Sequence, residues 1–148
     1  MDRFLTRLTV FVTNAMFYCG LGVLVLVPWI IFRIKRYSVY INDNPIQIIV
    51  IMMISGVLAI LIVWELKQIL KTLVQAEPFI IKNANSLNRI GIYCFLLSVT
   101  FLIKCIFWLT LATGLIVFIF MLISMFCMVL KSVFIQAVRY KEENDLTV

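Results

Sequence analysis

The sequence predicts an all-α fold, a polytopic integral membrane four-helix bundle. Of the 148 residues, 64% are hydrophobic and 14% are charged, and the mean hydropathy is +1.12. A typical soluble domain is roughly 45–50% apolar and about 25% charged. A globule of this size cannot bury the excess, because its surface would stay largely apolar, whereas a bilayer accepts it. We therefore expect a single membrane domain over residues 1–148.

Long uncharged segments place the four spans. A helix crosses the hydrocarbon core in about 20 residues. Each segment is continuously apolar and does not alternate with a period of two, which favours helices over a barrel. The segment between Arg89 and Lys131 carries only Lys104 as a charge and is long enough for two spans, with a turn near Thr110–Gly114. The predicted spans are residues 8–32, 45–64, 90–110 and 112–134.

Lysine and arginine predict the orientation, because cytoplasmic loops carry an excess of these residues. Nine fall on one side of the spans, namely Arg3, Arg7, Lys67, Lys71, Lys82, Arg89, Lys131, Arg139 and Lys141. The other side holds Arg33, Lys35 and Arg36. We expect a multi-pass protein of the cell (inner) membrane with both termini in the cytoplasm. The net charge of +6 follows from this topology and requires no direct nucleic-acid binding.

The residue inventory argues against catalysis and against a metal centre. The sequence has no histidine, and Cys19, Cys94, Cys105 and Cys127 show no paired spacing such as C-x-x-C. Metal sites need several converging ligands, and Ser–His or Cys–His pairs require a histidine. We expect a protein that is not an enzyme, binds no cofactor and keeps these thiols reduced within the spans.

Apolar residues continue past two of the spans at helical spacing. Beyond the second span these are Leu66, Ile69, Leu70, Leu73 and Val74, with Lys67 and Lys71 on the opposite face. Beyond the fourth they are Leu130, Val133, Phe134 and Ala137. We therefore expect helices two and four to extend into the cytoplasm, the second ending near Ala76 because Pro78 follows. Either the extensions lie flat on the lipid interface, or they pack together, with Leu70 or Leu73 touching Phe134 or Ala137.

A cytoplasmic corner, residues 65–89, joins spans two and three, and an acidic C-terminal tail, residues 141–148, follows the fourth span. We expect Asn83 or Asn85 to cap the helix that leaves the corner. Anionic lipid repels the carboxylates of the tail. They have two candidate partners: basic residues of the chain, or the basic surface of a DNA-binding protein, where carboxylates take the positions of phosphates.

Two segments resemble a known family. Residues 77–91, EPFIIKNANSLNRIG, and residues 140–148, YKEENDLTV, are similar to the "PF…N…L.RIG" loop and the "KEENDLT" terminus of the YoaS-like family of bacterial four-helix membrane proteins, domain of unknown function 2975. The four-span layout extends the resemblance over the whole chain. The resemblance implies no activity. Members are often encoded beside a very small helix-turn-helix regulator of the Cro/CI type, which suggests that regulator as a partner.

These observations predict a membrane-bound regulatory protein that binds a small Cro/CI-type DNA-binding protein and controls its access to DNA. The expected partner-binding residues are Phe79, Asn83, Leu87, Arg89, Glu142, Glu143, Asp145 and Leu146. Lys104, the one intramembrane charge, is expected to snorkel outwards, or to contact a lipid headgroup or an extracellular ligand.

Two other classes of function stay open. One is a small transporter, or an immunity or sensor protein for membrane-active peptides. The other is a membrane assembly factor that forms homo-oligomers through the small residues Ser55 and Ala59, or Thr110 and Gly114.

Overall fold

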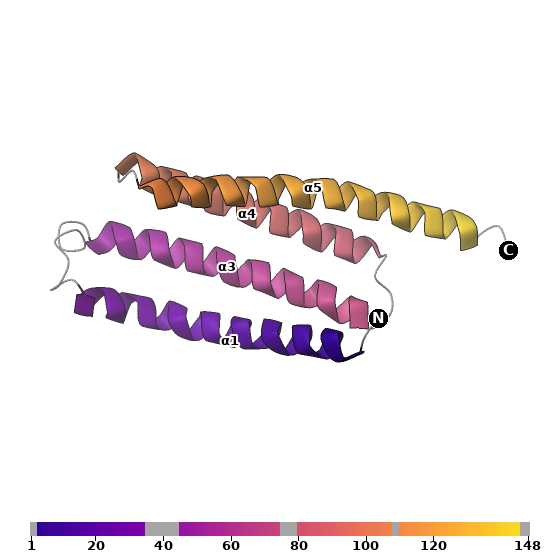
Figure 1. Ribbon diagram of the computed structural model, residues 1–148, viewed down its shortest axis with the longest axis horizontal. Coiled ribbons are helices and arrows are strands. Elements are labelled where there is room, and N and C mark those ends of the chain that lie inside the picture. The colour runs from indigo at the N-terminus through magenta and orange to yellow at the C-terminus, as the bar shows by residue number, and fades with distance from the viewer. Residues whose placement is uncertain (1–2, 35–44, 75–79, 108–109, 146–148) are drawn as a thin grey trace.

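Four long helices make up the protein (Figure 1). The computed structural model describes residues 3–34, 45–74, 80–107 and 110–145. The helices are α1 (Arg3–Ile34), α3 (Pro45–Val74), α4 (Ile81–Phe107) and α5 (Leu111–Asp145). All four are long and apolar enough to cross a membrane. The predicted all-α fold with four helices of membrane-spanning length is confirmed.

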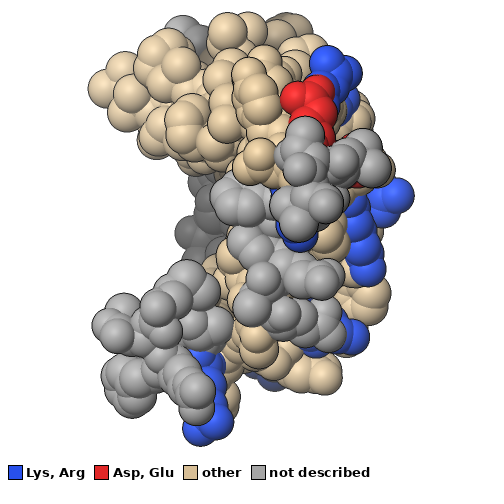
Figure 2. Space-filling view, turned by 90° about the vertical axis from the view of Figure 1, so that its right-hand side faces the viewer, with Lys and Arg blue, Asp and Glu red and all other residues tan. Residues whose placement is uncertain are grey.

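The helices pack in chain order as a curved row. α1 packs on α3, α3 on α4 and α4 on α5, so that α1 and α5 form the two edges. Neighbours run antiparallel, and the start of α1, the end of α3, the start of α4 and the end of α5 all lie at one end of the molecule (Figure 1). Viewed from that end, the row is concave on one side (Figure 2). The four-helix bundle is therefore open along one face.

The tightest packing lies between α4 and α5. Ile90, Cys94 and Cys127 form the buried cluster of the core, with Ile62, Ile69 and Phe120 packed against it. Gly91 permits this approach, since a Cβ on it would lie 3.3 Å from Cys127 Cβ and 3.4 Å from the Ser124 carbonyl oxygen. Small residues let helix backbones come close in a membrane, where packing rather than the hydrophobic effect holds helices together.

Two local expectations about helix starts are wrong. α4 begins at Ile81, and the Asn83 N–H donates to the Ile80 carbonyl at 3.0 Å, so Asn83 and Asn85 lie inside the helix and do not cap it. α5 begins at Leu111, and the Gly114 N–H donates to the Thr110 carbonyl at 3.1 Å. Residues 110–114 thus form the first turn of α5, because the Thr110 hydroxyl pairs with the Thr113 hydroxyl one turn on.

Helix α3 runs unbroken past Trp64 to Val74, so the second helix continues beyond the predicted span as expected. Ala76 and Pro78 lie outside the described residues. Of the two arrangements considered for the apolar stripe of α3, packing against α5 is not the one found, since α3 packs mainly on α1 and α4. Ile69 packs against the core, but Leu70 lines a cavity with Val10 and Thr13 of α1. Lys67 does not point outwards either, because its Nζ lies 5.5 Å from the ring centre of Phe17 on α1. The side of α3 that meets α4 carries the polar residues Glu65 and Thr72 beside Ile69.

We predict that Gly91→Leu destabilises the protein, because a larger side chain must push α4 away from Cys127 and Ser124. Overpacking of this kind costs about 1–3 kcal/mol. Thermal unfolding of the purified full-length protein in detergent, followed by circular dichroism, measures the change. Gly22→Leu is the matched control, since a Cβ at Gly22 meets nothing within 4 Å among the described atoms. Equal melting of the two variants would contradict the tight α4–α5 contact.

Candidate functional site

Polar side chains join three helices at the end of the bundle where α3 ends and α4 begins. Arg89 donates from Nη1 to Glu65 Oε1 at 3.0 Å, and the Thr72 hydroxyl donates to Asn83 Oδ1 at 2.8 Å. Lys131 Nζ on α5 donates to Asn88 Oδ1 at 3.2 Å. We call these six residues the polar cluster. It ties α4 to both of its neighbours.

Burial makes the Glu65–Arg89 pair the strongest constraint in the cluster. The Glu65 side chain is 5% exposed, whereas that of Arg89 is 60% exposed. A carboxylate in an apolar interface is costly unless a cation neutralises it. Arg89 therefore anchors Glu65 while keeping part of its guanidinium at the surface.

Sequence reasoning missed this cluster because it assigned the polar face of α3 to Lys67 and Lys71. The signal that identifies it is the spacing of Glu65, Ile69 and Thr72 at i, i+4 and i+7, which places the three on one face of a helix. In the structure that face meets α4.

A pocket of about 290 Å³ opens beside the cluster, between α3 and α4. We call it the corner pocket, and its lining residues are Glu65, Gln68, Lys82, Asn85, Ser86 and Arg89. Every lining side chain is polar or charged, so the pocket is suited to an ionic ligand and not to a hydrocarbon.

The predicted partner-binding residues of the corner fall in different surroundings. Asn83 is 1% exposed and accepts from Thr72, so it holds the corner together. Leu87 is half-buried and Arg89 is exposed. Phe79 lies outside the described residues.

The C-terminal tail continues α5. The helix extends to Asp145, and it projects beyond the ends of the other three helices (Figure 1). We call residues 139–144 the α5 arm, and all of them are exposed. Glu142 and Glu143 are therefore exposed residues of a helix. The Asp145 side chain and Leu146 lie outside the described residues.

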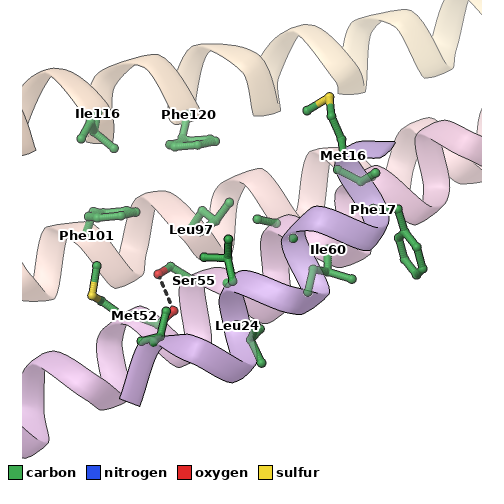
Figure 3. Close-up of a pocket in the computed structure, with 16 residues that line it drawn as sticks. Met16, Phe17, Leu24, Met52, Ser55, Ile60, Leu97, Phe101, Ile116 and Phe120 are labelled. Carbon is green, nitrogen blue, oxygen red and sulfur yellow. Dashed lines mark hydrogen bonds between the residues drawn. The ribbon is translucent and has the colours of Figure 1, made fainter. Parts of the chain in front are cut away.

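An apolar groove of about 530 Å³ follows the concave side of the bundle and receives side chains from all four helices. Met16 of α1 and Met52 of α3 lie opposite Phe101 of α4 and Phe120 of α5 (Figure 3). The groove holds one polar side chain, Ser55, whose hydroxyl donates within its own helix to the carbonyls of Ile51 and Met52. The groove thus presents a hydrocarbon surface.

The remaining chemical candidates occupy structural positions. Lys104 lies in the last turn of α4, with Nζ 5.9 Å from the centre of the Phe101 ring. A cation near a helix C-terminus and over an aromatic face is stabilised by both. Cys94 and Cys127 belong to the buried core, and Cys19 is exposed. Within the described ranges, no group of three or more His, Cys, Asp or Glu residues is placed to hold a metal.

Comparison with known proteins gives one result. A family model described as "Protein of unknown function (DUF2975)" matches residues 10–148. This is the domain of unknown function that the loop and C-terminal motifs indicated. No curated protein and no solved structure matches the chain.

We predict that Arg89→Gln destabilises the protein, because it leaves the buried Glu65 carboxylate without a cation. The loss of one partner of a buried hydrogen bond costs about 1–3 kcal/mol, and more when a charge remains. The double variant Glu65→Gln/Arg89→Gln should recover most of that loss, since a neutral amide replaces the charge. Thermal unfolding of the full-length protein tests both.

Arg139→Gln provides the matched control for this pair. Arg139 is exposed on the α5 arm, and its replacement should change the free energy of unfolding by less than about 0.5 kcal/mol. A double variant as unstable as Arg89→Gln would show that the buried charge is not the cause.

Proposed function

The chain belongs to the DUF2975 family, and we propose that it is a non-enzymatic regulatory membrane protein that holds a small DNA-binding protein at the cytoplasmic surface. The observation that carries this proposal is the α5 arm, a charged helix end that projects past the other helices beside the polar cluster (Figure 1). A projecting helix end supported by fixed contacts offers a protein partner a preorganised surface.

The distribution of positive charge supports a cytoplasmic position for this end. Lys67, Lys71, Lys82, Arg89, Lys131, Arg139 and Lys141 lie on the parts of α3, α4 and α5 that meet there. Cytoplasmic segments next to membrane spans carry such an excess. Both termini are then cytoplasmic, because α1 starts and α5 ends at the same end of the bundle.

The acidic residues of the arm suggest what the partner's surface is like. Glu142 and Glu143 lie in the last turns of α5, next to Lys141. A DNA-binding surface is basic, and carboxylates placed on it occupy phosphate positions. The expected partner is the small Cro/CI-type regulator that the family resemblance suggests, with Leu87 and Arg89 at the edge of its contact.

Regulation then requires only that the arm and DNA compete for the same basic surface of the regulator. A regulator whose basic surface is held by the arm is not free to bind DNA, so the fraction on DNA depends on the ratio of the two affinities. Because both complexes rest on charge pairs at the surface, both weaken as salt rises.

We predict that a charge reversal on the arm weakens this complex. Glu142→Lys should reduce co-purification of the regulator encoded beside this protein by about tenfold, since one exposed charge-assisted contact becomes repulsive. Lys141→Glu, which makes the opposite change on the adjacent residue, should leave co-purification unchanged or increase it. DNA carrying the regulator's binding site should displace the regulator from the membrane protein.

Two results would refute the proposal. One is a stable ternary complex of membrane protein, regulator and DNA, which would show that the surfaces do not compete. The other is undiminished association after deletion of residues 142–148, which would show that the arm and tail take no part.

A further inference from the structure

The corner pocket has the composition of an anion site. Its six lining residues include two cations, Lys82 and Arg89, and one anion, Glu65. Glu65 is neutralised by Nη1 of Arg89 at 3.0 Å, which leaves the other guanidinium N–H groups of Arg89 as donors. Lys82 makes no ion pair with any described residue and is exposed. Among the described residues, the lining of the pocket therefore carries one positive charge that no carboxylate compensates.

Ser86 adds a hydroxyl group to the lining of the corner pocket. The residue is 5% exposed, and its hydroxyl forms no hydrogen bond to a described residue but is open to the pocket. The hydroxyl of Ser86, the amides of Gln68 and Asn85 and the Lys82 ammonium supply donors of three kinds around one pocket.

The position of the pocket along α4 fits the headgroup layer of a bilayer. The 27 residues of α4 span about 40 Å, and the hydrocarbon core is about 30 Å thick. Roughly 10 Å of the helix therefore extends beyond the core. Lys82 and Arg89 lie in the first turns of α4, within about that distance of each other.

We propose that the corner pocket binds a phosphate oxyanion, carried by the headgroup of an anionic phospholipid or present as a free phosphate. The phosphate accepts hydrogen bonds from Lys82, Ser86 and the free N–H groups of Arg89, while Glu65 keeps the guanidinium in place. A volume of about 290 Å³ equals that of about ten water molecules, which admits a phosphate with a small substituent. This site does not rest on the proposed regulatory function, because it requires no protein partner.

Two variants test the site, each with a matched control. Lys82→Gln removes the uncompensated charge, and Lys71→Gln removes a lysine that lines the separate cavity between α1 and α3. Ser86→Ala removes the hydroxyl without changing the charge, and Ser132→Ala removes an exposed hydroxyl that bonds within α5.

The first part of the experiment measures the binding of lipid. Full-length protein in detergent receives phosphatidylglycerol or phosphatidylcholine, and native mass spectrometry counts the bound lipid. We expect wild-type protein, Lys71→Gln and Ser132→Ala to retain phosphatidylglycerol preferentially. Lys82→Gln and Ser86→Ala should bind it about tenfold more weakly, the effect of one lost charge-assisted contact.

The second part of the experiment measures the binding of free phosphate. Inorganic phosphate and chloride are compared at equal ionic strength by the thermal unfolding midpoint of the lipid-free protein. A phosphate-specific rise that Lys82→Gln and Ser86→Ala abolish assigns the site to free phosphate, and lipid selectivity without such a rise assigns it to a headgroup. The proposal is overturned if neither ligand depends on Lys82 and Ser86, or if Lys71→Gln and Ser132→Ala reduce binding as strongly.

Discussion

The buried carboxylate of Glu65 is the constraint on which the polar end of this protein depends. Removing a carboxylate from water costs several kcal/mol unless a cation lies against it, and Arg89 is the cation that α4 supplies at 3.0 Å. The pair fixes the register of two antiparallel helices. Thr72 follows Glu65 along α3, and Asn83 precedes Arg89 along α4. Thr72 and Asn83 form the next hydrogen bond between the two helices. Side chains that would be unfavourable singly thus select one alignment.

Much of the fold was predictable because membrane spans leave a strong signal in composition. The four helices, their approximate positions and the family all follow from uncharged segments and two short motifs. The sequence does not show which face of each helix packs against its neighbours. In a bilayer the lipid is as apolar as leucine, so an apolar stripe carries little information about packing. Packing of Leu70 against α5 was one of two open alternatives, and in the structure Leu70 lines a cavity beside α1, while Glu65 and Thr72 mark the packed face.

The predicted partner-binding residues overlap the polar cluster only in part. Arg89 and Asn83 were selected as partner-binding residues, and both belong to the polar cluster, but Asn83 is enclosed by it. The acidic tail was expected as a segment separate from the spans, whereas α5 includes it as far as Asp145. The apolar groove was not foreseen, because its residues come from all four helices. With the Ser55 hydroxyl bonded within its own helix, the described lining of the groove is a hydrocarbon surface.

The two proposals are linked through charge. The end of the molecule that carries the α5 arm also carries the start of α4, with Lys82 and Arg89 (Figure 1). A basic DNA-binding protein approaching that end is attracted by Glu142 and repelled by the corner. A phosphate in the corner pocket would reduce the repulsion, because its negative charge compensates the positive charge of the pocket. If the corner pocket binds lipid and the arm binds the regulator, the two binding events favour each other, since by linkage each ligand changes the affinity for the other by the same factor. On that hypothesis, the composition of the membrane around the corner sets how strongly the arm holds its partner.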